Sequence, residues 1–262
     1  MGIIISYTHR VRSIVSIDYD HLKNLHSISG PRAALPVLLA GKKVASLLDV
    51  GCGTGTWLKA ALSLGIPDVL GVDGIKIPPD QLNVSVDRIR HQDLTRPWNL
   101  TRKFDAVLCL EVAEHLNSEF APILIDALVM HSTQIHFSAA CPGQTGQHHV
   151  NCQWPAYWQQ LFNDRGFVCN DAVRWRIWEM EAVEPWYRQN VFTARRAPEE
   201  AGKEPRIPAV LHPEMMHWLK SSTAGGSFGE HVEQIQNGRM PLGWYLGVPL
   251  RALLAKSKRK LR

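Results

Sequence analysis

The sequence predicts an α/β domain in which a mostly parallel sheet is covered by helices on both faces. Short apolar runs alternate along the chain with segments of helical character, and glycines end several of these helical segments. Strands that are apolar throughout are typical of a sheet buried on both faces, and the helices between them then connect parallel strands. We therefore expect one layer of strands between two layers of helices.

The predicted elements follow one another from residue 44 onward. The first apolar run leads into a glycine-rich loop, and two of the helices after it end at Gly65 and Gly166. Glycine commonly ends a helix because it adopts the left-handed conformation without a steric cost. The predicted strands are 44–50, 69–72, 104–110, 134–138, a segment from 167 onward and 190–194, and the predicted helices are 56–64, about 123–130 and 155–164.

The chain is expected to have three parts. Residues 1–40 are predicted to form an N-terminal helical segment, in which Pro31 opens a new helix at its first turn. Residues 41–195 carry the alternating strands and helices and form the expected ligand-binding domain. Residues 196–262 are predicted to be a C-terminal extension, because 196–206 has the composition of a linker.

The positive charge of the chain is concentrated at one end. The 262 residues include 29 Lys+Arg and 24 Asp+Glu, a formal net charge of +5. Six of the basic residues and no acidic residue lie in 251–262, so the rest of the chain has 23 basic and 24 acidic residues. A nucleic-acid-binding domain carries its basic residues over a face of the fold. No nucleic-acid partner is therefore expected.

The lack of a recognisable secretory signal and the pattern of the cysteines predict a cytoplasmic protein. The apolar stretch 2–5 is too short for a secretory signal, and no run is long enough for a membrane-spanning helix. Residues 1–6 match only the short myristoylation pattern. The five cysteines are odd in number and contain no C-x-x-C pair, so neither a disulfide framework nor a metal site is expected.

The strongest functional signal is a glycine loop between a predicted strand and a predicted helix. Asp49 lies near the end of the apolar run, and glycines follow at every second position, at 51, 53 and 55. Glycines allow a tight turn and the close approach of a ligand, and the next helix offers unpaired N–H groups at its start. The spacing differs from the dinucleotide fingerprint, and no Gly-Lys-Ser/Thr follows.

The string D-x-G-x-G-x-G resembles the first motif of the class I methyltransferases that use S-adenosylmethionine. Segments 69–73, 91–94 and 104–116 follow at matching distances and resemble later motifs, the last through its E-V-A-E-H-L string. The resemblance implies a Rossmann-like fold with a seven-stranded, mostly parallel sheet. It implies cofactor contacts at Asp49, Gly51, Cys52, Gly53, Gly55, Asp73, Gly74, Asp93, Leu94 and Glu111.

Within this set the resemblance implies three roles for acidic residues. The Asp73 carboxylate would accept hydrogen bonds from the ribose hydroxyls of S-adenosylmethionine. Asp93 would lie near the adenine amine, and Glu111 would end a strand beside the cofactor. Asp105 is instead interpreted as a strand-edge or capping residue.

The acceptor is expected to bind beyond the same ends of the strands. The loop 139–154 is long and polar, and such loops tend to carry function. A hydroxyl acceptor must lose its proton, which suits a histidine. The candidate catalytic residues are His115 and His149, with Glu114 as a partner. The alternatives are that His115 packs against the cofactor loop and that His149 only holds its own loop by hydrogen bonds.

Residues 137–190 are similar to a bacterial subgroup of methyltransferases often associated with polysaccharide or glycan assembly. The similarity is carried by the strings at 138–144, 149–158, 174–178 and 186–190. It implies O-methylation of a saccharide or another small hydroxylated acceptor, and the lack of an N-P-P-Y-type motif also favours oxygen over an exocyclic nitrogen. A binding module without turnover is the alternative. Methylation of RNA or protein is a third reading, and the near-neutral body disfavours RNA.

Two features leave alternatives open. Arg174, Arg176 and Arg188 either pair with acidic residues or meet an anionic acceptor. Residues 240–262 combine an apolar segment with a basic cluster, which suits peripheral contact with a membrane interface. A solvated tail or a packing arm is the alternative for that segment.

Overall fold

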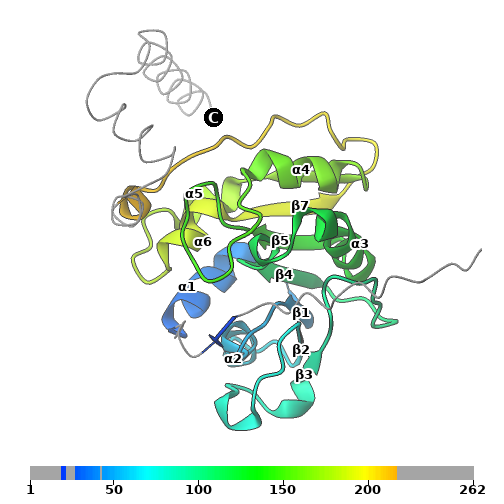
Figure 1. Cartoon of the computed structure of the whole chain (residues 1–262), viewed down its shortest axis with the longest axis vertical. Helices are drawn as coiled ribbons and strands as arrows, with labels where there is room; N and C mark the ends of the chain where they lie inside the picture. Colours follow the sequence, from blue (N-terminus) through cyan, green and yellow to red (C-terminus); the bar gives the residue numbers. More distant parts are fainter. Residues whose placement is uncertain (1–18, 22–26, 42, 217–262) are drawn as a thin grey trace, which may run out of the picture.

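The computed structural model describes residues 19–21, 27–41 and 43–216. Its centre is a seven-stranded sheet in the order β3-β2-β1-β4-β5-β7-β6, with helices on both faces (Figure 1). The strands β1 to β5 pair in parallel, whereas β7 runs antiparallel to β5 and β6. The strands are β1 Ser46–Val50, β2 Asp68–Asp73, β3 Ile89–His91, β4 Ala106–Leu110, β5 Gln134–Ser138, β6 Phe167–Asn170 and β7 Phe192–Arg196.

Helices connect the strands and cover both faces of the sheet. They are α1 Ser29–Leu38, α2 Thr56–Ser63, α3 Ala121–His131, α4 Pro155–Asn163, α5 Ala172–Ile177 and α6 Pro185–Asn190. Short 3-10 turns are η2 Pro79–Gln81, η3 Val86–Arg88, η4 Ala113–His115 and η5 Ser118–Phe120. The predicted Rossmann-like α/β class is confirmed.

Two apolar cores lie on opposite faces of the sheet. Leu48 of β1 packs with side chains of α3 and α4, whereas its neighbour Leu47 packs with side chains of α1 and α2. Successive side chains of a strand point to opposite faces, so a strand buried on both sides is apolar throughout. This explains why each central strand reads as an unbroken apolar run.

The differences from the predicted elements are small and have physical reasons. β3 was not predicted because it has three residues, two of them exposed. The strand expected from residue 190 begins at Phe192, because α6 continues to Asn190. α1 begins at Ser29, where a break before a new helix was expected, and it contains Pro36.

Residues 197–216 pack against the sheet domain. The Glu204 carboxylate accepts hydrogen bonds from Gln159, Asn163 and the backbone N–H of Cys169, and the Ile207 side chain is buried. The expected linker at 196–206 therefore has fixed contacts in the structure. The division of the chain after residue 195 stays a prediction.

Several expectations concern residues outside the described part. These are the myristoylation pattern at 1–6 and the basic tail with its membrane contact. Within the described residues, no helix is long and apolar enough to cross a membrane.

Candidate functional site

The glycine loop joins β1 to α2 at the carboxyl ends of the central strands. Gly51, Gly53 and Gly55 have φ values of +74°, +51° and +81°, a region that side chains disfavour. A Cβ atom on Gly51 would also lie 2.8 Å from Cγ1 of Val112 and closer still to its other methyl group. The backbone path therefore favours glycine at all three positions, and at Gly51 the close approach of the segment after β4 also requires it.

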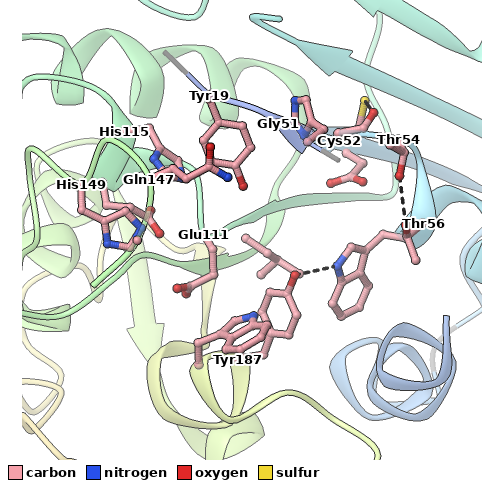
Figure 2. Close-up of a pocket in the computed structure, with 18 of the residues that line it drawn as sticks. Tyr19, Gly51, Cys52, Thr54, Thr56, Glu111, His115, Gln147, His149 and Tyr187 are labelled. Atoms are coloured by element: carbon pink, nitrogen blue, oxygen red, sulfur yellow. Dashed lines mark hydrogen bonds between the residues drawn. The ribbon is translucent and has the colours of Figure 1, made fainter. Parts of the chain in front are cut away.

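Two adjoining cavities open over this loop. The first has a volume of about 340 Å³ and extends from Asp49 to His149, and the second, of about 410 Å³, extends along Asp73 and Leu94. Figure 2 shows the first cavity, with Tyr19, Gly51, Glu111 and His115 around it. Ligands of parallel α/β sheets bind at this edge. The described structure thus has room for an elongated ligand at the predicted place.

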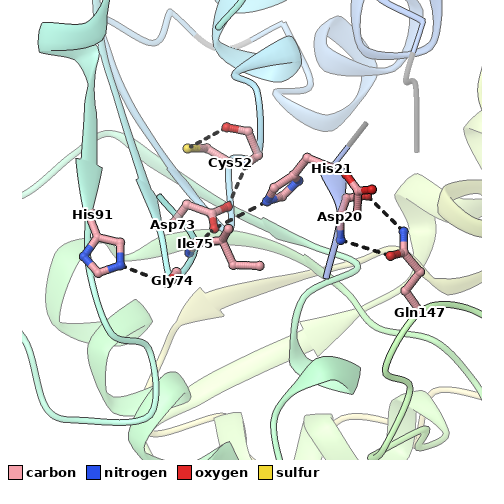
Figure 3. Close-up of polar contacts among 9 residues, drawn as sticks. Asp20, His21, Cys52, Asp73, Gly74, Ile75, His91 and Gln147 are labelled. Carbon is pink, nitrogen blue, oxygen red and sulfur yellow. Dashed lines mark hydrogen bonds and ion pairs between the residues drawn. The ribbon is translucent and has the colours of Figure 1, made fainter. Parts of the chain in front are cut away.

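Asp73 ties the glycine loop to the end of β2. Its carboxylate accepts hydrogen bonds of 2.8 Å from the backbone N–H groups of Gly53 and Ile75 (Figure 3). The His21 ring lies 3.7 Å from the same carboxylate. Each carboxylate oxygen has a second lone pair. The position therefore suits the predicted role as acceptor for ribose hydroxyls.

Asp49 is buried in the first cavity, and its Oδ2 has no hydrogen-bond partner among the described residues. Burial, together with the negative charge of Asp73, raises its pKa to about 8. A buried carboxylate without a partner is stabilised by a cation. The cationic amino group of S-adenosylmethionine fits this requirement.

The remaining predicted cofactor residues lie along the second cavity or under the loop. Leu94 is buried in the cavity wall, and the Gly74 carbonyl lies 3.0 Å from Nε2 of His91. The Asp93 carboxylate accepts hydrogen bonds from the backbone and hydroxyl of Thr95, so it holds its own turn at the cavity edge. The buried Cys52 thiol donates to the Gly53 carbonyl.

Glu111 follows β4 and has a positive φ of 57°, which is uncommon for a residue with a side chain. Its carboxylate accepts hydrogen bonds from Gln144, at 2.7 Å, and from Asn190, at 3.2 Å. Burial raises its pKa to about 7. Gln144 and Asn190 were not predicted as site residues, although both lie in strings that carried the family resemblance.

Glu114, His115 and His149 form a cluster at one end of the first cavity. The first two lie in η4, and the third lies in the loop 139–154. The Glu114 carbonyl accepts hydrogen bonds from the N–H groups of Val150 and Asn151, which fastens that loop to η4. The two imidazole rings have centroids 5.0 Å apart (Figure 2). All three residues predicted to be catalytic are thus brought together.

Burial controls the charge of this cluster. Desolvation, and then the charge of His149, lowers the pKa of His115 to about 4. Burial also lowers the pKa of His149, while burial and the charge of Glu111 raise the pKa of Glu114 well above its ordinary value. Both imidazoles are therefore neutral near pH 7. A neutral imidazole has a free lone pair that accepts a proton or binds a metal.

Residues 19–21 cross the site and were not predicted. The Gln147 side-chain amide exchanges two hydrogen bonds of 3.0 Å with the backbone of Asp20 (Figure 3). The Tyr19 ring packs edge-on against the His115 ring, with the ring centroids 4.8 Å apart. Both Tyr19 and His21 line the two cavities. No sequence signal marks this short segment, because its contacts lie far along the chain.

The structure also shows the contacts of two of the three arginines and of Asp105. Arg174 and Arg188 are buried and pair with Asp171 and Glu214, so they have structural roles. The Asp105 carboxylate accepts hydrogen bonds from the backbone at the start of β1, which confirms its interpretation as a capping residue.

Comparisons with known proteins found similarity to methyltransferases over part of the chain. Residues 24–132 match the model of a family described as "Methyltransferase domain". A segment of 93 residues is 36% identical to dTDP-3-amino-3,6-dideoxy-alpha-D-glucopyranose N,N-dimethyltransferase of Streptomyces fradiae. That match covers 34% of this chain, and the chain spans about a third, 34%, of the length of that relative.

Similar solved structures share only low sequence identity with the chain. The plantazolicin methyltransferase BpumL in complex with a pentazolic desmethylPZN analog and SAH is 15% identical, with a TM-score of 0.45, over 64% of this chain and 84% of that one. Magnesium protoporphyrin IX methyltransferase of Synechocystis PCC 6803 with bound SAM is 20% identical, with a TM-score of 0.45, over 65% of this chain and 81% of that one.

The match to the methyltransferase-domain model covers residues 24–132, which include the glycine loop and the strands β1 to β4. The described residues fit S-adenosylmethionine as cofactor. Asp49 offers a buried carboxylate for its amino group, Asp73 offers acceptors for its ribose, and the glycines leave the loop without side chains that would fill the cavity.

Proposed function

We propose that the chain transfers a methyl group from S-adenosylmethionine to a hydroxyl oxygen of a saccharide or another small hydroxylated acceptor. The observation that carries the proposal is the cluster of Glu114, His115 and His149, which shares one cavity with Asp49 and the glycine loop. A polar cluster beside the cofactor site is where an acceptor hydroxyl must be held and lose its proton.

The chemistry requires alignment more than covalent participation by the protein. An O–CH3 bond forms as the S–CH3 bond breaks, and the acceptor hydroxyl loses its proton. Holding the two reactants in line supplies much of the rate. In this proposal Asp49, Asp73 and the glycine loop hold the cofactor, while the cluster at the other end of the cavity orients the hydroxyl for the loss of its proton.

The acceptor class is supported by two observations. The similar Streptomyces protein is named for a dideoxy amino sugar, although it methylates nitrogen. The cavity also contains the side chains of Trp186, Tyr187 and Trp57, whose rings can pack on the apolar face of a sugar. An uncharged or mildly charged acceptor fits a cavity without lysine or arginine among its described lining residues.

Activity screening tests this proposal. The full-length protein is incubated with methyl-labelled S-adenosylmethionine and with extracted surface glycans, free sugars and nucleotide sugars. We expect label in a methyl ether on a sugar hydroxyl. Label on a sugar nitrogen would contradict oxygen as the acceptor atom, and cofactor binding without label in any acceptor would favour the alternative of a non-catalytic binding module.

Peripheral membrane contact through the basic residues at 256–260 remains a further part of the proposal. The residues lie outside the described part of the chain, and only their sequence supports the contact. A membrane position would suit a lipid-linked or growing glycan acceptor.

A further inference from the structure

The cavity that contains the cluster has an excess of buried acidic groups. Asp49, Glu111 and Glu114 all line it, and no lysine or arginine is among its described lining residues. A bound S-adenosylmethionine would supply positive charge at the Asp49 end through its amino and sulfonium groups. Glu111 accepts hydrogen bonds from Gln144 and Asn190. The third carboxyl group, that of Glu114, lies beside that of Glu111, and no lysine or arginine lines the described cavity near it.

Glu114 is the least satisfied of the three. Its side chain is fully buried, and neither carboxylate oxygen has a hydrogen-bond partner among the described residues. A buried carboxyl group without well-aligned hydrogen bonds is costly, and a bound cation would stabilise its charged form. The arrangement is therefore incomplete as the protein alone forms it.

The same three residues are placed as metal ligands. Glu114, His115 and His149 each offer one ligand atom, and these atoms all lie within 4.8 Å of one another. Metal–ligand bonds of about 2.0–2.2 Å place the ligands of a tetrahedral ion roughly 3.5 Å apart. Side-chain adjustments of about 1 Å would therefore close the ligands around an ion.

The ring nitrogens of the two histidines are also placed for ligation. Nδ1 of His149 lies 2.9 Å from the Gln144 carbonyl, so Nδ1 donates and the lone pair is at Nε2. A backbone carbonyl on the second ring nitrogen is the usual way in which proteins orient a ligating histidine. Nδ1 of His115 is buried and makes no hydrogen bond within the described residues.

We propose that Glu114, His115 and His149 bind a divalent transition-metal ion, such as Zn²⁺ or Mn²⁺. Two imidazole nitrogens and one carboxylate oxygen suit such an ion better than Mg²⁺ or Ca²⁺, which prefer oxygen ligands. No metal site was expected from the sequence, because the cysteines form no metal-binding motif. The cluster forms no local sequence motif, because η4 and the loop 139–154 are far apart in the chain.

The metal site deepens the proposed function, and the role of the ion in catalysis rests on that function. Three protein ligands leave a coordination position open towards the cavity, as in catalytic metal sites. An acceptor hydroxyl oxygen bound there would lose its proton to water more readily, because the ion stabilises the alkoxide. That oxygen then forms the O–CH3 bond while the S–CH3 bond breaks.

Titration of the metal-free full-length protein with Co²⁺ tests the metal site without any acceptor. We expect visible d–d absorption that saturates at one equivalent and disappears on addition of Zn²⁺. His149→Gln and Glu114→Gln should weaken Co²⁺ binding by more than about 100-fold, the upper end of the effect of losing even an outer-shell partner. His148→Asn is the matched control, since it removes the adjacent imidazole outside the cluster, and it should leave Co²⁺ affinity unchanged.

The outcomes separate the metal site from the methyltransferase activity. Absence of stoichiometric Co²⁺ binding, or equal affinity in wild type and His149→Gln, overturns the metal proposal. Calorimetry with S-adenosylhomocysteine on each variant shows that its cofactor site is intact. Turnover that persists in excess chelator would support the proposed methyl transfer and refute the proposed metal site. Co²⁺ binding without turnover on any acceptor would support the metal site and refute the proposed function.

Discussion

Replacement of Gly51 by alanine tests the reason for the glycine loop quantitatively. Two costs add at this position. The left-handed backbone, at φ +74°, costs an alanine about 1–2 kcal/mol. The new methyl group would also lie 2.8 Å from Cγ1 of Val112, whose branched side chain has little freedom to move. Overpacking of this kind costs about 1–3 kcal/mol.

We therefore expect Gly51→Ala to lower the free energy of unfolding by about 2–5 kcal/mol. Gly41→Ala is the matched control, because Gly41 also has a positive φ, of +67°, but no described atom lies within 4 Å of a Cβ there. It should lose only about 1–2 kcal/mol. Chemical denaturation with urea measures both values.

The double variant with Val112→Ala isolates the steric cost. If the clash is real, removing the Val112 methyl groups should recover part of the loss in the Gly51→Ala background, as a coupling energy in a double-mutant cycle. A loss for Gly51→Ala no larger than that for Gly41→Ala would refute the reasoning. So would a coupling energy of zero.

Three further predictions concern the cofactor site, acid stability and the tail. Asp73→Asn should weaken S-adenosylhomocysteine binding by at least about tenfold in calorimetry, because hydrogen bonds to a charged group contribute about 1.5–3 kcal/mol; unchanged affinity would remove Asp73 from the cofactor site. Burial alone would raise the pKa of Glu204, but hydrogen bonds from Gln159, Cys169 and Asn163 outweigh it and hold this pKa at about 2, below the ordinary value of 4.5. A carboxyl group whose pKa is lowered by folding stabilises the protein above its unfolded pKa and loses this contribution as the pH falls towards 2. We expect Glu204→Gln to cost about 1–2 kcal/mol at pH 7, after allowance for its partial exposure, and the gap from wild type to close between about pH 5 and pH 2; a gap independent of pH would contradict this. Replacing Lys256, Lys258, Arg259 and Lys260 by glutamine should reduce flotation with anionic liposomes, and equal flotation would end the membrane proposal.

The parts of the site that were predicted from sequence are those encoded by contiguous residues. Asp49 and the loop glycines are close in the chain, and the acid at Asp73 follows at the end of the next strand along the chain. Such local patterns survive in the sequence because the backbone path itself requires them. The central apolar strands were predicted for a similar reason, since burial on both faces leaves an unbroken apolar run.

The parts that were not predicted depend on contacts between distant residues. Gln144 and Asn190 meet at Glu111 only after the loop 139–154 and α6 have folded over the sheet. Tyr19 and His21 reach the cavities from the far N-terminal side. No local pattern in the sequence predicts these contacts. The three-residue strand β3 was not predicted for a different reason, since two of its residues are exposed and it has no apolar pattern.

The most direct test of the central claim is calorimetric titration of the full-length protein with S-adenosylhomocysteine. The glycine loop, the unpartnered Asp49 and the position of Asp73 predict saturable binding at one site. They also predict weaker binding for Asp49→Ala, which removes the carboxylate expected to meet the amino group. No measurable binding to the wild-type protein, or equal affinity in Asp49→Ala, would contradict the assignment of this cavity to S-adenosylmethionine.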